Sequence, residues 1–298
     1  MNFQNMAVSI FEKQNDKMLL KCLCKQRKVY TSVKHIQFWV VLIEVGLVTI
    51  LTIITTIWQN EYASSCLTIV NMSILIASKY IERITDRNQE TAAKIQQYFD
   101  ATCYNTVSEQ TLFTLNSIFV HSELAELIAD IKESELPDLK NWYSDYSNLS
   151  PKKQILFSQN ENINWDSKLR TFYKRSIIVF SVLMIAGIII YGVISNIPFN
   201  NWITVVSFVL VILDCDINSI LKLNDDIGRL IKLADIQKKI EKQIENNCFS
   251  FYEKIIELQN YIYEHRKNCF LIPDFIYKVR KKTYQSNEDK TALILKDL

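Results

Sequence analysis

Three carboxylates lie inside stretches of the sequence that are otherwise almost wholly apolar. Glu44 lies in residues 38–58, and Asp214 and Asp216 lie in residues 202–221. If these stretches cross a ~30 Å hydrocarbon layer, a rise of 1.5 Å per residue puts all three ~9 to 12 Å from its inner edge. An ionised carboxylate at that depth is costly and is expected to face a helix interface or water. A ring of such groups in an assembled pore favours cations, and we therefore predict that these residues line a pore.

The same carboxylates allow two other interpretations. Lys79, at the inner end of a neighbouring apolar stretch, could neutralise one of them. Asp214 and Asp216 would lie among lipid headgroups if their stretch is shifted along the membrane normal. The sequence leaves these alternatives open.

Catalytic and metal-binding patterns are missing from the sequence. There is no Gly-rich phosphate loop, no HExxH, no GxSxG and no carboxylate cluster for nucleotide transfer. Of the seven cysteines, Cys22 and Cys24 form a CxC pair, but no second pair or nearby His accompanies it. We therefore expect no enzyme activity, no metal and no cofactor.

The elements that must position the carboxylates are four apolar stretches in two close pairs. Each approaches the ~20 residues that a helix needs to cross a bilayer. Only Lys79 among the 34 Lys and Arg residues lies within them, and the chain has only four Gly and four Pro. The predicted fold class is therefore an all-α membrane protein with two transmembrane helical hairpins, whose spans are residues 38–58, 63–80, 176–197 and 202–221.

The distribution of basic residues predicts the topology. Seven precede the first stretch, 12 fall between the pairs when Lys79 is included, and 15 follow the last. Because Lys and Arg near membrane ends mark the cytoplasmic side, both tight turns should face outward and both termini should be cytoplasmic. No signal peptide is visible. The expected division is 1–37, an N-terminal amphipathic helix; 38–80, the first hairpin; 81–175, a cytoplasmic helical segment; 176–221, the second hairpin; and 222–298, a second cytoplasmic helical segment.

Several cytoplasmic helices are expected from apolar periodicity. Residues 11–37 could lie on lipid headgroups or pack on other cytoplasmic helices. The second span should continue to about residue 105, and 117–135 should form another helix. Residues 240–262 carry apolar side chains every three or four positions, which predicts one long helix with a single buried seam. That seam could pack on the central segment of the same chain or form a coiled coil between subunits.

A series of short motifs accompanies the two hairpins in a fixed order. They are FEKQN at 11–15, QRKVY at 26–30, IQQYFD at 95–100, NWY at 141–143, SQN at 158–160, NWD at 164–166, LR at 169–170, LQNYI at 258–262, Arg266, and IPDFIYKVR at 272–280. From about residue 8 to 285 the chain resembles the four-transmembrane pore-forming effectors associated with SMODS-type second-messenger nucleotidyltransferases of bacterial anti-phage operons. It departs from that pattern at residues 101–106 and at Ser158.

The resemblance implies a multi-pass effector of the bacterial inner membrane. Its cytoplasmic part would sense a cyclic di- or trinucleotide, and its spans would associate as a homo-oligomer that permeabilises the membrane and aborts infection. The implied functional link is to a cyclic-oligonucleotide synthase, and no DNA or RNA polymer is an expected partner. Two other classes stay open: a constitutive cation channel or transporter subunit, and a membrane-anchored scaffold that binds a protein.

Within the resemblance, the motifs supply side chains suited to such a ligand. Phosphates are bound by Arg and Lys, and bases stack on aromatic rings or guanidinium planes. The candidate ligand residues are Trp142, Tyr143, Trp165, Arg170, Arg266, Tyr277 and Arg280. The alternative is that these residues hold helices together, with Asp100, Asp166 and Asp274 as partners for the arginines. The basic cluster at 278–282 could be solvated or could face lipid headgroups.

Overall fold

A computed structural model describes residues 8–57, 61–108, 110–194, 198–244 and 250–296. Within these ranges the regular elements are helices and there is no strand, which confirms the predicted all-α class. The low content of Gly and Pro explains this result, because few positions interrupt a helix.

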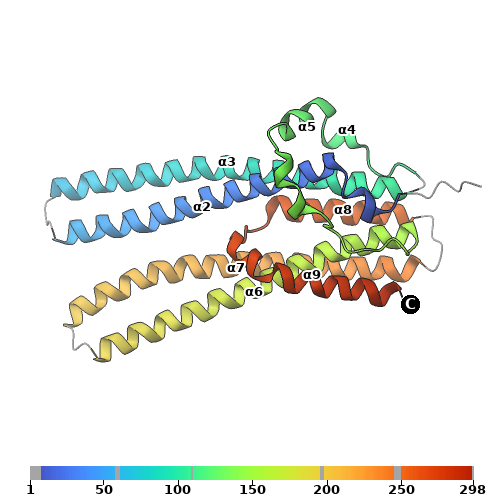
Figure 1. Cartoon of the computed structure of the whole chain (residues 1–298). Coiled ribbons are helices and arrows are strands. Elements are labelled where there is room, and N and C mark those ends of the chain that lie inside the picture. Colours follow the sequence, from blue (N-terminus) through green and yellow to red (C-terminus); the bar gives the residue numbers. More distant parts are fainter. Residues whose placement is uncertain (1–7, 58–60, 109, 195–197, 245–249, 297–298) are drawn as a thin grey trace, which may run out of the picture.

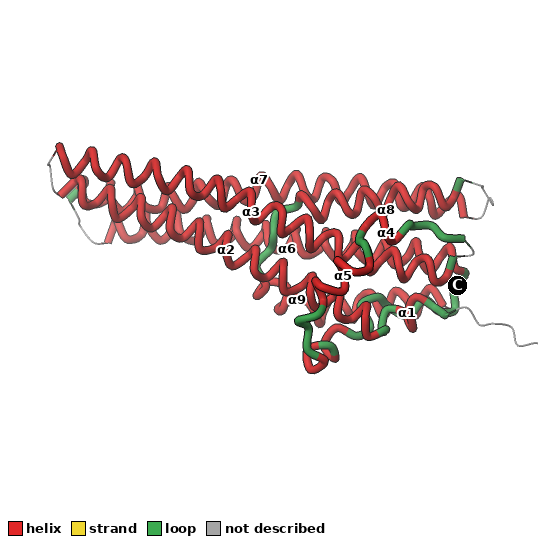
Figure 2. Tube along the Cα trace, turned by 90° about the horizontal axis from the view of Figure 1, so that it is seen from above, coloured by secondary structure: helices red, strands yellow, loops and turns green. Residues whose placement is uncertain are grey.

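Four long helices form two hairpins. The first pairs α2 (Lys17–Ile57) with α3 (Glu61–Val107), and the second pairs α6 (Pro151–Ile194) with α7 (Phe199–Ile244). Figures 1 and 2 show the two hairpins side by side, with their connected ends at one end of the molecule and the shorter helices around the other. The 41 residues of α2 extend roughly 60 Å, about twice the thickness of a hydrocarbon layer. Each long helix is thus long enough for an apolar span and a polar extension.

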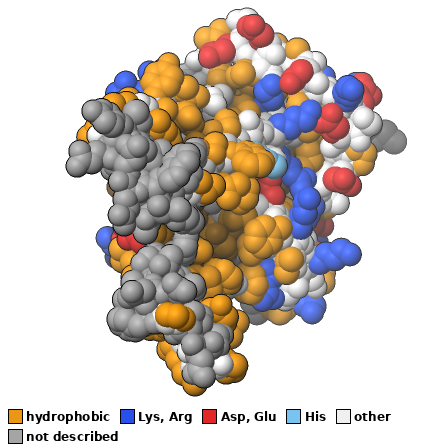
Figure 3. Space-filling view, turned by 90° about the vertical axis from the view of Figure 1, so that its left-hand side faces the viewer, with side chains coloured by type: hydrophobic (Ala, Val, Ile, Leu, Met, Phe, Trp, Pro, Cys, Tyr) orange, Lys and Arg blue, Asp and Glu red, His pale blue; other side chains and the backbone are white. Residues whose placement is uncertain are grey.

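Toward the connected ends of the hairpins, described apolar side chains such as Ile50, Val193 and Ile194 are exposed. Seen from that end, hydrophobic side chains gather behind and between the hairpin ends, whereas charged side chains gather toward one side (Figure 3). Among the described residues, only α6 meets the length and hydropathy expected of a membrane span, and its most apolar window is 6% buried. This exposed apolar helix indicates a membrane protein, while the presence of four spans stays a prediction.

One contact near the hairpin ends requires a small residue. A Cβ atom added to Gly192 of α6 would lie 2.3 Å from Nε1 of Trp202 on α7. Gly192 therefore marks a place where α6 and α7 approach closely.

The N-terminal segment packs on the other helices. A capping box of Ser9 and Glu12 caps the N-terminus of helix α1 (Ile10–Lys13), and α2 begins four residues after α1 ends. Leu19, Leu20 and Leu23 of α2 are buried in the main core. Of the two alternatives for residues 11–37, packing on other helices of the chain is observed for this part of α2.

The helix predicted for residues 117–135 is wrong. The chain instead forms α4 (Leu115–Ile118), α5 (His121–Ile128) and the 3-10 turns η1 (Glu133–Glu135) and η2 (Pro137–Leu139). Phe119 adopts an extended backbone between α4 and α5, with φ −144° and ψ 140°. This break lets Phe119 share one apolar cluster with Leu124 of α5 and Tyr98 of α3.

The single long helix predicted through residues 240–262 is also wrong. Helix α7 ends at Ile244 and α8 (Phe251–Asn268) returns antiparallel to it, with Lys254 bonded to Gln243 and Arg229 donating to the Asn268 carbonyl at 3.5 Å. Helix α8 packs on both α7 and α3. The apolar period continues across the reversal because both helices bury their seams in the same core. The chain then ends in α9 (Asp274–Lys296), which lies along α6.

Candidate functional site

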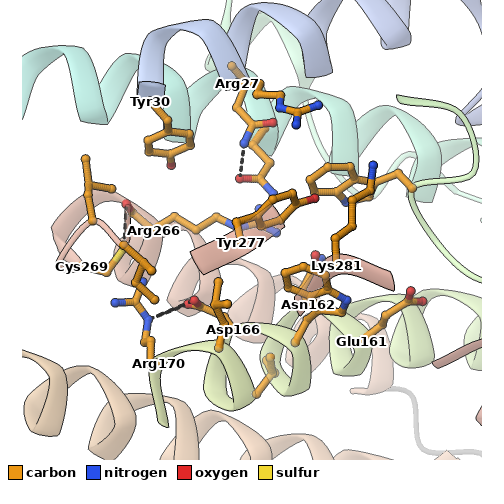
Figure 4. A pocket seen from close by; sticks show the side chains of 18 of the residues that line it. Arg27, Tyr30, Glu161, Asn162, Asp166, Arg170, Arg266, Cys269, Tyr277 and Lys281 are labelled. Carbon is orange, nitrogen blue, oxygen red and sulfur yellow. Dashed lines mark hydrogen bonds and ion pairs between the residues drawn. The ribbon is translucent and has the colours of Figure 1, made fainter. Parts of the chain in front are cut away.

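A cavity of about 270 Å³ lies among the polar extensions of the two hairpins. Residues of all four long helices line it, together with residues of α8 and α9, of η2, and of the segments that follow η2 and α8. Figure 4 shows Arg27 and Tyr30 on the α2 side, Asp166 and Arg170 on the α6 side, and Tyr277 between them. The cavity is therefore positioned to respond to the separation of the two hairpins.

Aromatic rings form one wall of the cavity. The Trp165 and Tyr277 ring centroids are 5.0 Å apart with planes inclined by 42°, and Tyr284 meets Trp165 edge-on at 5.5 Å. The Arg27 guanidinium lies 5.9 Å from the centroid of the Tyr277 ring. Such surfaces suit a planar heterocycle, which can stack on aromatic or guanidinium faces.

Arg170 is bound to carboxylates on two helices. Its Nε donates to Asp166 at 3.0 Å, and its Nη1 donates to Asp226 of α7 and, at 2.8 Å, to the Phe270 carbonyl. Although burial opposes ionisation of Asp166, Arg170 and His265 hold the pKa of that carboxyl well below its usual range. The guanidinium is thus occupied, and it joins α6 to α7 and to the segment after α8.

Arg266 belongs to a second buried centre. Its Nη1 donates to Asp100 of α3 at 2.6 Å, and Asp100 also accepts from the Tyr143 hydroxyl at 2.5 Å and from Gln259 at 3.0 Å. Asn162 donates to the Tyr143 hydroxyl at 2.9 Å. These bonds join α8 to the first hairpin, so the two arginine centres together hold both hairpins to α8.

Three buried polar side-chain atoms of cavity residues have no hydrogen-bond partner in the described part of the chain. They are Oε1 of Gln26, Nη2 of Arg266 and Nδ1 of His265. Buried polar groups are ordinarily satisfied, so an unpaired donor at a cavity is a candidate contact for a ligand oxygen or nitrogen. Arg266 can therefore hold Asp100 with one nitrogen and meet a ligand with the other.

The cavity also carries cations that carboxylates do not occupy. Arg27, Lys140 and Lys281 have no ion pair within the described ranges, whereas Lys34 pairs with Asp274 at 2.7 Å. Arg27 and Lys140 are exposed, which places them at the mouth. An aromatic wall beside cations that no described carboxylate pairs with suits a planar anionic ligand.

One carboxyl of the cavity, that of Glu161, is buried and has no cation at ion-pair distance among the described residues. Glu161 accepts hydrogen bonds from the Ser144 amide and hydroxyl, at 3.0 and 3.1 Å. Burial raises the pKa of Glu161 to about 7, with the nearby carboxylate of Glu288 acting in the same direction. Near neutral pH this carboxyl is partly protonated and can both donate and accept.

Six of the seven candidate ligand residues line this one cavity. They are Trp142, Tyr143, Trp165, Arg170, Arg266 and Tyr277. Arg280 lies elsewhere, with its guanidinium carbon 3.7 Å from the centroid of the Phe172 ring. Asp166 and Asp100 do pair with Arg170 and Arg266, as the alternative interpretation expected, while Asp274 pairs with Lys34. Ligand contact by any of these residues stays a prediction.

The sequence interpretation missed the free cations. Arg27 and Tyr30 stand three residues apart in the QRKVY motif and thus share one helix face, a signal that could have selected them. Lys281 follows the last motif and was assigned only to a basic cluster. Among the described residues no group of His, Cys, Asp and Glu could hold a metal ion.

The three carboxylates of the apolar half lie in one neighbourhood, because all of them act electrostatically on the Cys215 thiol. Asp216 accepts from the Ser181 hydroxyl of α6 at 2.6 Å, and Asp214 is exposed and accepts from Asn218 at 3.2 Å. Lys79 pairs with Glu82 at 2.8 Å. A pore lined by Glu44, Asp214 and Asp216 stays a prediction.

Comparison with known proteins gives one family and one curated relative. Residues 8–293 match the SMODS-associating 4TM effector domain. A probable CBASS effector molecule of Bacillus cereus (strain VD146) is 26% identical over 204 residues, which are 65% of this chain and 66%, just under two thirds, of that protein. No solved structure matches the chain.

Proposed function

The chain belongs to the SMODS-associating 4TM effector domain family, and from this premise we propose that it is a ligand-gated, membrane-permeabilising effector of bacterial anti-phage defence. Its ligand is a cyclic di- or trinucleotide made by a partner synthase, and its action on the membrane aborts infection. The name of the Bacillus cereus relative, a probable CBASS effector, supports the same role.

The membrane part consists of four spans in the inner membrane, with both termini in the cytoplasm. The length of the long helices, the exposed apolar side chains of α6 and the distribution of Lys and Arg support this arrangement. Reporter fusions near residue 120 and at the C-terminus should both read cytoplasm. A periplasmic reading for either would overturn this topology.

The observation that carries the ligand proposal is the cavity between the hairpins. Its aromatic rings offer faces on which bases can stack, and its three cations without an ion pair among the described residues suit phosphates that carry one negative charge each. The buried Nη2 of Arg266 supplies a further donor. A neutral or cationic ligand would leave these cations without a counter-charge.

The position of the cavity supplies a route from binding to permeation. Arg27 lies on α2, whereas Lys281 lies on α9, which packs on α6. A ligand whose phosphates bind both Arg27 and Lys281 favours a particular distance between α2 and α9, which differs from the distance without ligand. Because α2 and α6 continue into the apolar half, that change reaches the spans, where association of several chains forms the pore.

The test is dye release from liposomes that contain the purified full chain, with a panel of cyclic di- and trinucleotides added outside. Release should require one member or a few members of the panel, and linear dinucleotides are the matched control. Release without any nucleotide would indicate a constitutive channel. A chain that inserts but releases nothing with any member would indicate a scaffold.

A further inference from the structure

Helix α9 begins at the level where the apolar half of the molecule begins. Asp274, its first residue, accepts hydrogen bonds from Thr31 and Lys34 of α2, both at 2.7 Å. Lys34 lies four residues before Phe38, the first residue of the first apolar stretch. Measured from the first hairpin, the start of α9 is therefore about 6 Å from that boundary.

The second hairpin gives the same level independently. Helix α9 runs antiparallel to α6, since the Tyr284 hydroxyl donates to the Lys168 carbonyl at 3.3 Å and Arg280 lies over Phe172. Extending this register by five residues brings Phe275 beside residue 177, where the third apolar stretch begins. Both hairpins thus put Phe275 at the boundary.

The outer face of these first turns is apolar and basic. Phe275 and Val279 are 63% and 66% exposed, and Lys278 and Lys282 are exposed without an ion pair among the described residues. The four positions are separated by three, one and three residues, which is the spacing of a single helix face. A helix face with apolar and basic side chains is typical of segments that bind an anionic membrane surface.

We propose that the first two turns of α9 bind anionic lipid headgroups of the inner leaflet. Phe275 and Val279 enter the boundary between headgroups and acyl chains, while Lys278 and Lys282 pair with lipid phosphates, as flexible lysines at an interface do. The occupant is lipid because the face is continuous with the apolar half and its charge is opposite to that of the leaflet. This inference rests on the membrane insertion in the proposed function.

The inner face of the same turns belongs to the cavity. Tyr277 and Lys281 line it, and Ile276 is buried between the helices. Lipid binding on one face of α9 therefore fixes a cavity wall on the other. The bilayer surface becomes a determinant of how the cavity is shaped.

Photocrosslinking of the full chain in nanodiscs tests the lipid contact. One residue at a time is replaced by p-benzoylphenylalanine: Phe275, the equally exposed Leu183 of α6 (65%), or Leu293 (60%), which lies on α9 about 27 Å further from the boundary. Phospholipid adducts are expected at positions 275 and 183 and not at 293.

Each other outcome overturns the inference in a recognisable way. An adduct at 183 without one at 275 leaves membrane insertion standing and removes the lipid contact of α9. A crosslink from 275 to a second copy of the chain makes this face a protein interface. No adduct at either position removes insertion and this inference together.

Hydrogen exchange tests the role of charge. Amide exchange in residues 275–282 should slow when phosphatidylglycerol is added to phosphatidylcholine nanodiscs, by about fivefold for each lysine engaged. The Lys278→Glu/Lys282→Glu variant should lose this difference, and Lys290→Glu, an exposed lysine further along α9, should keep it. Equal exchange in both lipids for the unmodified chain would refute the electrostatic part.

Discussion

Arg266 of α8 and Arg27 of α2 line one cavity, and their surroundings differ in burial and in charge pairing. Arg266 is 8% exposed and holds the fully buried Asp100, whereas Arg27 is exposed, has no carboxylate partner in the described structure and lies over Tyr277. A buried charge that loses its partner is strongly destabilising, so the Arg266 pair must persist through any ligand cycle. A ligand can pair with the charge on Arg27 without breaking an ion pair among the described residues, so binding there should not lower the stability of the fold.

This contrast separates charges that hold the helices from charges that can bind. Arg266 joins α8 to α3, and Arg170 joins α6 to α7 and to the segment after α8. At the cavity, Arg27, Lys140 and Lys281 have no ion pair among the described residues. Removing a holding charge should therefore change stability, and removing a free charge should change ligand affinity. Four substitutions test that division, from the largest expected effect on stability to the smallest.

Asp100→Ala should have the largest effect. It leaves Arg266 and the Tyr143 hydroxyl buried without their shared acceptor, and the free energy of unfolding should fall by about 3–5 kcal/mol. Chemical denaturation of the purified chain in detergent, followed by near-ultraviolet circular dichroism, measures it. The control is Asp130→Ala, which removes an exposed, solvent-screened partner of Lys25 and should leave the free energy of unfolding almost unchanged. If Asp100→Ala and Asp130→Ala lowered the free energy of unfolding equally, Asp100 would contribute no more to stability than an exposed carboxylate does.

Arg170→Met should have the second largest effect and should lower the free energy of unfolding by about 2–3 kcal/mol. The loss is smaller because Arg229 still pairs with Asp226 after Arg170 is removed. In Arg170→Met/Asp226→Leu no buried carboxylate is stranded at position 226, so the double variant should be more stable than the sum of the single losses predicts. Strict additivity in the denaturation cycle would show that the pair contributes nothing as a pair.

Glu161→Gln tests a buried group that, unlike Asp100, has no ion-pair partner among the described residues. Its pKa is raised from 4.5 to about 7 in the fold. The unfolded chain therefore releases this proton first, and the stability of the native protein falls as pH rises through that window. The amide does not titrate, so between pH 5 and pH 8 the free energy of unfolding of the variant should rise by about 2–3 kcal/mol relative to that of the native chain.

The pH series needs a control for the change of charge alone. Glu126→Gln, on the exposed face of α5, provides it and should track the native chain at both pH values. A stability difference between Glu161→Gln and the native chain that stays constant with pH would contradict a buried, protonated Glu161.

Arg27→Ala should have the smallest effect on stability, within about 0.5 kcal/mol, because the side chain is exposed and unpaired. Affinity for the active cyclic nucleotide should fall about tenfold, the loss expected for one charge-assisted hydrogen bond. Isothermal titration measures this affinity. Lys28→Ala is the control, since Lys28 is the neighbouring exposed cation and pairs with Glu135 outside the cavity. Equal affinities for the two variants would remove Arg27 from the ligand site.

The sequence predicted the long helices because apolar periodicity and the scarcity of Gly and Pro are local signals, which do not depend on how the helices pack. It could not predict the reversal between Ile244 and Phe251, since the apolar period runs through it without a Gly or Pro. The break at Phe119 escaped prediction for a similar reason. The helical periodicity of residues 117–135 does not reveal that Phe119 must turn inward to meet Tyr98.

The motifs predicted which residues line the cavity better than they predicted the role of each residue there. Aromatic and basic side chains from distant motifs do converge, but an arginine in a motif does not reveal whether an aspartate already holds it. Arg266 and Arg27 are the same residue type in comparable motifs, and only the packing of α8 against α3 separates their roles.

The pair of Asp100 and Arg266 spans 166 residues of sequence, and this separation bears on how the protein is made. At a synthesis rate of about 5–20 residues per second, the ribosome needs roughly 10–30 s after Asp100 before Arg266 exists. During that interval α3 carries a carboxylate whose partner has not yet been translated. A nascent chain that stalls before α8 has neither arginine centre complete, and its hairpins lack the helix that joins them. Translation to the end of α8 is therefore a condition for a responsive molecule, and a truncated product cannot build the cavity.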